Sequence, residues 1–209
     1  MGEARYPHRL DKVAIAMLSS MNAKEHGVKK YGIGEELPLN LMCWRNDRLE
    51  LVMCAKEEVR SSGSDERFRI IQEALCIARR GWGITAFTLI AEAYCSLDPS
   101  ITDGLDLRKE FCKHDSPVME CLTIAHVEPG EVTFITKPYR YECGRKVEWE
   151  EELYYPGHTR VQGQEAMFPN LLSKVLVDVQ QDTPPVDEIT YYAELGDGLL
   201  AKGFVCDWL

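Results

Sequence analysis

The sequence has 209 residues, 45% of them hydrophobic and 28% charged, which is enough to bury one sizeable core. Its formal net charge is −10, with 24 Lys and Arg against 34 Asp and Glu. This acidic balance argues against nucleic acid or an anionic membrane surface as a partner. No apolar run reaches the roughly 20 residues of a membrane span, and no apolar leader opens the sequence. We therefore expect a cytoplasmic protein.

The first part of the chain predicts one helix and one hairpin. Apolar residues recur at helical spacing from residue 10 to residue 21, and His26-Gly27 suggests where this helix ends. Two short apolar runs, 37–45 and 49–55, flank Asn46-Asp47, two residues that tolerate turn conformations. The pattern predicts two antiparallel strands.

A helix and a buried strand are expected next. Residues 65–80 have an apolar stripe at helical spacing, with acidic residues at the start and basic residues at the end. Gly81-Trp82-Gly83 should end this helix. Residues 84–94 are apolar on both alternating faces, as in a central strand. A turn-rich loop, 97–104, and a short helix, 105–113, should follow.

The remaining chain predicts a meander, a helix and a terminal hairpin. Strands at 118–127 and 132–141 should be joined by Pro129-Gly130, with a third strand at 146–153. Residues 164–177 have helical spacing, and 180–188 have linker composition. Two runs, 189–195 and 199–208, flank Gly196-Asp197-Gly198, which predicts a hairpin.

These elements together predict an α+β fold with a single mixed, mainly antiparallel sheet, helices packed on it and a C-terminal β-hairpin extension. We expect one domain over 1–182. The hairpin, 183–209, should pack on this domain or on a partner subunit.

Familiar catalytic and metal motifs are missing from the sequence. It contains neither G-x-x-x-x-G-K-[ST] nor G-x-S-x-G, and Gly32-Ile33-Gly34 lacks the third glycine of a dinucleotide fingerprint. The eight cysteines never form C-x-x-C, so reduced thiols are favoured over a zinc site. We predict no cofactor.

Glu92 is the strongest candidate functional residue, because it places a carboxyl group in an otherwise apolar strand. A buried carboxylate must be paired or must shift its pKa. The alternative is that the strand end emerges into solvent. In the loop that follows, Asp98, Asp103 and Asp106 are candidate ligands of a divalent cation.

Two histidines are further candidates. Cys112, His114 and His126 could assemble a metal site, and the catalytic candidates are thus Glu92, Asp98, His114 and His126. For His126 the simpler interpretation is a half-exposed imidazole at a strand end, beside the Glu128-Pro129-Gly130 turn.

Aromatic residues near the acidic run 148–152 suggest a surface for a protein partner, since Tyr and Trp are usual interface anchors and core packing is their alternative role. The candidate interface residues are Tyr139, Tyr141, Trp149, Tyr191, Tyr192 and Trp208.

Three functions remain open. The favoured hypothesis is a non-enzymatic cytosolic protein that acts through protein contacts or self-association, as a homo-oligomer. The first alternative is a small hydrolase, either metal-dependent or metal-free, with a cleft at the C-terminal end of strand 84–94. The second is a small-ligand-binding module.

Overall fold

A computed structural model describes residues 8–32, 36–96, 118–142, 146–151, 153–155 and 172–208. It confirms the α+β class: helices lie on both faces of one eight-stranded sheet, and every strand pair is antiparallel. No helix in these ranges is both long enough and apolar enough to span a bilayer.

The strand order along the sheet is β6-β5-β4-β3-β1-β2-β8, and β7 pairs with β5 beside β6. The 84–94 run forms a central strand, as predicted, flanked by β1 and β4. The strands are β1 (Asn40–Arg45), β2 (Arg48–Ala55), β3 (Ala86–Ser96), β4 (Val118–Glu128), β5 (Glu131–Glu142), β6 (Lys146–Trp149), β7 (Leu153–Tyr155) and β8 (Phe204–Trp208).

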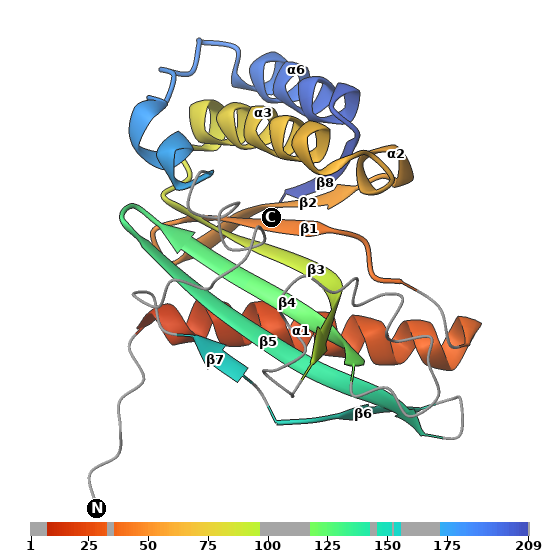
Figure 1. Cartoon of the computed structure of the whole chain (residues 1–209). Helices are drawn as coiled ribbons and strands as arrows, with labels where there is room; N and C mark the ends of the chain where they lie inside the picture. The colour runs from red at the N-terminus through yellow and green to blue at the C-terminus, as the bar shows by residue number, and fades with distance from the viewer. Residues whose placement is uncertain are drawn as a thin grey trace, which may run out of the picture.

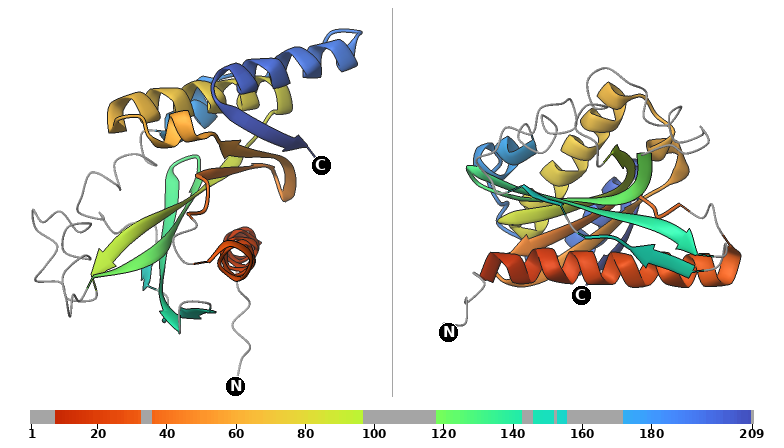
Figure 2. Two further views of the ribbon diagram at one scale, coloured as in Figure 1. Left: turned by 90° about the vertical axis from the view of Figure 1, so that its right-hand side faces the viewer. Right: turned by 60° about the horizontal axis from the view of Figure 1, so that its bottom comes forward.

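Helices divide between the two faces of the sheet. Among the described helices, α1 (His8–Tyr31) lies across one face, while α2 (Glu57–Arg60), α3 (Ser64–Trp82) and α6 (Glu188–Ala201) lie on the other (Figures 1 and 2). Residues 172–178 are also helical and cover part of the α3 face. They are the described part of the helix predicted at 164–177.

The predicted hairpin at 37–55 and the predicted turn between strands 118–127 and 132–141 are confirmed. Asn46 turns between β1 and β2 with φ 55°, a left-handed conformation that Asn tolerates better than most residues. Gly130 turns between β4 and β5 with φ 80°. Strand positions alternate between the α1 face and the α3 face, except where the register of β1 and β2 shifts between Cys43 and Trp44.

The larger core lies between the sheet and α3. Ile71, Leu75 and Ala78 are buried at helical spacing, and they pack with inward residues of β1, β2 and β3. Gly83 ends α3 in the left-handed region, with φ 62°. The predicted stop at Gly81-Trp82-Gly83 is therefore confirmed.

Helix α1 is longer than predicted, because its buried stripe continues past Gly27. Val13, Ala16, Ser20, Lys24 and Val28 are buried, mostly four residues apart, so one stripe faces the sheet for the whole length of the helix. A glycine within a helix costs only about 1 kcal/mol, which this packing offsets.

The C-terminal segment corrects one prediction. Its last part is a strand, as expected, but 189–195 belongs to helix α6 rather than to the first arm of a hairpin. Gly196 and Gly198 lie inside this helix, and a Cβ at Gly198 would lie 3.6 Å from Ile77 of α3. The glycine-rich run therefore continues the helix instead of making a turn, and the close approach of the two helices lies at Gly81 of α3, where a Cβ would be 2.2 Å from Leu195 Cδ1.

The third predicted strand of the meander is divided in two. Both β6 and β7 pair with β5, and between them the Glu150 amide donates to the carbonyl of Pro138 over 2.9 Å. The predicted loop 97–104 and helix 105–113 lie outside the described residues. The six described cysteines are free thiols.

Candidate functional site

Glu92 joins three parts of the chain through its carboxylate. Its Oε1 accepts from Lys24 Nζ at 2.6 Å and from the Tyr139 hydroxyl at 2.7 Å, and its Oε2 accepts from the Leu37 amide at 2.9 Å. The side chain is 13% exposed. Glu92 is thus neither isolated in the core nor free in solvent; it holds α1 and the segment before β1 against β3 and β5.

Lys24 is the cation that balances this carboxylate inside the protein. Its side chain is only 2% exposed, and Nζ lies 5.2 Å from the ring centroid of Tyr139 and 5.8 Å from that of Tyr141. Aromatic faces attract an ammonium group, and the attraction grows when water is excluded. Burying such a pair is costly and seldom stabilises a fold by itself.

Tyr139 and Tyr141 stay protonated over the usual pH range. Burial raises the pKa of the Tyr139 phenol far above its ordinary value, and the Glu92 carboxylate raises it further. Burial also raises the pKa of Tyr141, helped by the Glu120 carboxylate. Tyr139 is therefore a fixed donor to Glu92.

A cavity of about 410 Å³ adjoins Glu92. It lies where β3 extends past the start of β1, so that residues 36–39, α2 and the first turn of α3 face the exposed part of β3 and its neighbours β4 and β5. Its charged lining residues are Glu36, Glu57, Glu92, Glu120, Arg60 and Arg67.

Most of these charges are paired within the chain. Arg60 contacts Glu36 at 2.8 Å and Glu57 at 3.2 Å, and Glu92 is paired with Lys24. Arg60 is therefore flanked by two carboxylates, so this part of the cavity wall carries a net negative charge.

Arg67 and Glu120 are the exceptions. Arg67 Nη2 donates to the carbonyls of Arg60 and Ser62 at 2.6 and 2.8 Å, but its buried Nε has no hydrogen-bond partner. The buried Oε2 of Glu120 has none either, and neither residue forms an ion pair with any part of the chain that the structure describes. Within the described ranges, one cavity is thus lined by a cation and an anion that each keep one buried polar atom without a hydrogen-bond partner.

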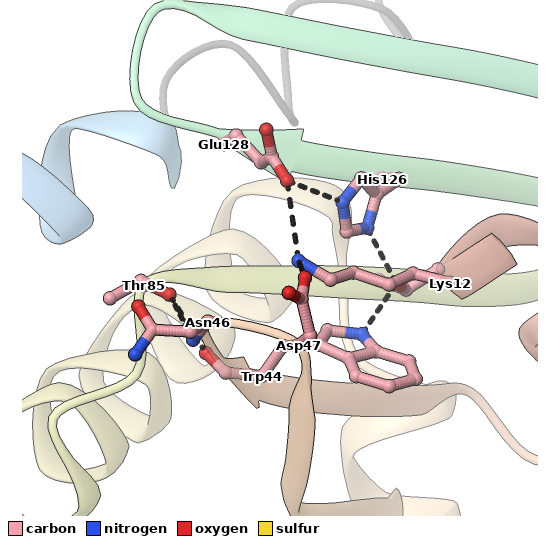
Figure 3. A network of polar contacts seen from close by, with 8 residues as sticks. Lys12, Trp44, Asn46, Asp47, Thr85, His126 and Glu128 are labelled. Atoms are coloured by element: carbon pink, nitrogen blue, oxygen red, sulfur yellow. Dashed lines mark hydrogen bonds and ion pairs between the residues drawn. The ribbon is translucent and has the colours of Figure 1, made fainter. Parts of the chain in front are cut away.

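A second polar cluster lies at the other end of α1 (Figure 3). Lys12 Nζ is 3.3 Å from Asp47 and 3.6 Å from Glu128, whose Oε1 is 3.3 Å from His126 Nε2. His126 Nδ1 is 2.8 Å from the Thr88 hydroxyl.

In this cluster the carboxylate of Glu128, the imidazole of His126 and the hydroxyl of Thr88 are connected in the same order as the groups of an acyl-transfer triad. However, Thr88 and His126 are 0% exposed, and Trp44 Nε1 donates to the Thr88 hydroxyl over 3.0 Å. A substrate cannot reach a hydroxyl that is buried in this way. The cluster is structural, and the expected half-exposed imidazole of His126 is wrong, because α1 covers this end of β4.

The sequence candidates do not converge on one site. Glu92 lines the cavity, whereas His126 belongs to the second cluster, four residues away along the β3–β4 ladder, or about 13 Å. Asp98, Asp103, Asp106, Cys112 and His114 lie outside the described residues. Within the described ranges no three His, Cys, Asp or Glu side chains gather as metal ligands.

The aromatic interface candidates mostly contact their own chain. Tyr139 is buried against Glu92, and Trp149 Nε1 donates to Glu25 over 2.7 Å. Tyr192 packs on Trp82 with ring centroids 5.5 Å apart, and the Tyr191 hydroxyl donates to Asp182 over 3.2 Å. Tyr141 lies beneath Lys24, and Trp208 is the last residue of β8, opposite Leu51.

Sequence reasoning missed Lys24, Arg67 and Glu120. Glu120 carries the same signal that singled out Glu92, a carboxyl group in an otherwise apolar strand. Lys24 lies at a buried position of the α1 stripe, but a lysine there is easily taken for a solvated residue. No local sequence pattern distinguishes Arg67 as a residue that lines the cavity.

No protein-family model, curated protein or solved structure matches this chain. The geometry of the cavity is therefore the basis for a functional proposal.

Proposed function

We propose that this chain is a small-molecule-binding protein and that its ligand occupies the cavity beside Glu92. The observation that carries the proposal is a cavity lined by Arg67 and Glu120, each of which has one buried polar atom without a hydrogen-bond partner and forms no ion pair with the described residues. Buried polar atoms of folded proteins nearly always have partners, and exceptions need an explanation. A ligand that contacts both residues supplies one.

The size and lining of the cavity support binding of a small molecule. Its volume of about 410 Å³ lies within the range of known ligand pockets, roughly 300–1,000 Å³. The buried Lys24–Glu92 pair fixes one side of the cavity, so that the site is preorganised. Binding without reaction requires nothing further, whereas the hydrolase hypothesis also needs a nucleophile or metal.

A thermal-shift screen with a mixed library of anionic, cationic, zwitterionic and neutral metabolites tests this proposal. A ligand present at 100 times its Kd adds about 2.7 kcal/mol to the stability. For a chain of this size we expect the melting temperature to rise by roughly 5–10 °C.

Two matched variants connect the shift to the cavity. Ala93→Leu fills a position in the cavity lining, whereas Ala23→Leu adds the same atoms at an exposed site on α1. The proposal predicts that A23L keeps the ligand-induced shift and that A93L loses it. A library without any stabilising compound, or a shift that persists in A93L, contradicts the proposal.

A second candidate function, self-association in the cytoplasm, rests on the edge strand β8. Among the described strands β8 pairs only with β2, and Val205 on it is 51% exposed. An open antiparallel edge can add a second copy about a two-fold axis.

Native mass spectrometry should show a dimer of the wild-type chain. Val205→Lys should abolish this dimer, whereas Val177→Lys, at an exposed position on another element, should leave it intact. A monomeric wild-type chain rules this candidate out.

A further inference from the structure

We infer that helix α6 is a docking surface for a basic amphipathic helix of a partner protein. The surface is an exposed apolar stripe on α6, formed by Ile189, Ala193 and Leu200, together with Val186 just before the helix. None of these residues lines the cavity beside Glu92, so the inference goes beyond the proposed function and does not depend on it.

Helix α6 carries apolar side chains on two of its sides. One side faces the protein, where Leu199 is buried in the larger core and Leu195 packs against that core. The stripe forms the second side. Ile189, Ala193 and Leu200 follow one another at steps of four and seven residues, so they project within about 40° of one another around the helix axis. A helix that is apolar on both sides is normally buried on both, which indicates a partner for the second side.

The stripe is exposed to an unusual degree for large apolar side chains. Val186 is 107% exposed and Ile189 is 86% exposed, the two highest values among such residues in the described ranges. Leu200 is 49% exposed. Single exposed apolar residues are normal on a protein surface, whereas several that are contiguous mark an interaction site. From Ile189 to Leu200 the stripe is about 16 Å long, or three helical turns.

The charge around the stripe selects its occupant. Between residues 181 and 201 the chain has five acidic residues and no Lys, Arg or His. Glu188, Glu194 and Asp197 are exposed, and none of the three forms an ion pair with a residue that the structure describes. Lys202, the first basic residue after the helix, is already in an ion pair with Glu73. Lysine and arginine side chains of a partner would complement this surface.

The same charge disfavours the other occupants of an apolar surface. A second copy would bring its own acidic α6 against this one, and the whole chain has a net charge of −10. An anionic membrane surface would be repelled for the same reason. A helix fits the stripe better than an extended segment does, because side chains three and four residues apart on one helix pack between those of another.

Selection from two displayed peptide libraries tests the inference. Both libraries encode helices of about five turns, long enough to be helical on binding, with variable apolar residues spaced three and four apart. The flanking positions are Lys or Arg in one library and Glu or Asp in the other. The full wild-type chain should select binders from the basic library only. The best binder is then labelled, and its Kd is measured by fluorescence anisotropy.

Matched variants assign the binder to α6. Ile189→Lys and Leu200→Lys should each weaken binding by roughly tenfold or more, because they place a charge in the centre of the interface. Leu18→Lys, on the exposed side of α1, changes the net charge equally and should bind as the wild type does. Asp197→Asn should weaken binding roughly threefold, since a charge at the rim contributes little. Asp65→Asn, at an exposed position on α3, is its control.

Each outcome decides the inference. It is wrong if neither library yields a binder, if the acidic library yields the stronger binder, or if L18K weakens binding as much as I189K does. Sedimentation analysis of the wild-type chain without peptide tests the second copy as occupant, because a dimer that I189K dissociates would overturn the inference. The ligand of the cavity is tested separately by the metabolite screen, so either proposal can fail without the other.

Discussion

At the scale of single residues, the Lys24–Glu92 pair should be indispensable only as a pair. Removing one partner leaves a buried charge uncompensated, which typically costs about 3–5 kcal/mol. We therefore expect Lys24→Met to lower the free energy of unfolding by roughly that amount, measured in urea at pH 7. Lys24 is 2% exposed and Glu92 13%, so solvent does little to reduce the effect.

The double variant K24M/E92Q separates a charge effect from a packing effect. With both charges gone, it should lose less stability than the sum of the two single variants. Additive losses would show that the two side chains act independently, in spite of the 2.6 Å contact between Nζ and Oε1.

Tyr139 should make the stability sensitive to alkaline pH. Burial and Glu92 raise the pKa of its phenol above the ordinary value of 10.0, so its contribution is complete below pH 10 and is lost as the pH rises above it. Tyr139→Phe removes the hydrogen bond to Glu92 and should cost about 1.5–3 kcal/mol at pH 7. Above pH 10 the gap between Y139F and the wild type should narrow.

Urea denaturation between pH 7 and pH 11 measures both effects of Tyr139. Tyr31→Phe is the control, since Tyr31 is largely exposed at the end of α1. Y31F should follow the wild type at every pH. A constant gap for Y139F up to pH 11 would contradict the assignment of the alkaline dependence to this phenol.

Sequence reasoning at this scale finds groups that break a pattern, but not their partners. Glu92 was identifiable because a carboxyl group in an apolar strand is unusual. Lys24 and Tyr139 were not identifiable as its partners, because they come from α1 and β5 and meet it only through tertiary packing. His126 was misjudged for the same reason, since its burial depends on a helix more than a hundred residues away in the chain.

At the scale of elements, Asp187 should control the start of α6. Its side chain accepts from the Thr190 amide at 3.1 Å and from the Thr190 hydroxyl at 2.7 Å, and these contacts lower the pKa of Asp187 below the ordinary 3.8. The stabilisation is thus present at neutral pH and lost as the pH falls through the lowered value. Asp187→Ala should lower the melting temperature modestly at pH 7 and by less at pH 3.

Asparagine supplies the control for this cap. Asp187→Asn keeps an acceptor oxygen and should melt close to the wild type at pH 7, without the loss of stability at low pH that comes from this residue. A D187A variant that melts like the wild type at pH 7 would mean that the cap contributes nothing to α6.

Elements with local signals were predictable, and the one wrong element shows why others are not. The turn at Asn46 and the left-handed end of α3 at Gly83 depend on the residue types at those positions and on their neighbours in the sequence. The run Gly196-Asp197-Gly198 is equally typical of a hairpin turn, and only the packing of α6 on α3 decides otherwise. Gly81 shows the reciprocal contact, because a Cβ there would lie 2.2 Å from Leu195 Cδ1. A glycine of α3 that makes room for a leucine of α6 is a tertiary signal that a linear pattern cannot reveal.

At the scale of the whole molecule, residues 183–209 should be part of the folding unit rather than a detachable extension. Leu199 and Phe204 are fully buried in the larger core, and β8 forms the edge of the sheet beside β2 (Figure 1). Removing 183–209 would expose this core surface, and large losses of buried apolar side chains typically cost several kcal/mol each. We expect the truncated chain 1–182 to lose cooperative thermal unfolding, followed by circular dichroism.

Adding the missing piece in trans distinguishes lost packing from a general failure to fold. A peptide of residues 183–209 should restore cooperative unfolding of the 1–182 chain in a concentration-dependent way, because α6 and β8 make their contacts through surfaces that the larger fragment retains. The same peptide with Phe204→Ala should restore less, since its buried ring is the anchor of β8. If the truncated chain instead melts cooperatively at the temperature of the full protein, the sheet is complete without β8. That result would favour a role for the terminal segment in contacts between subunits.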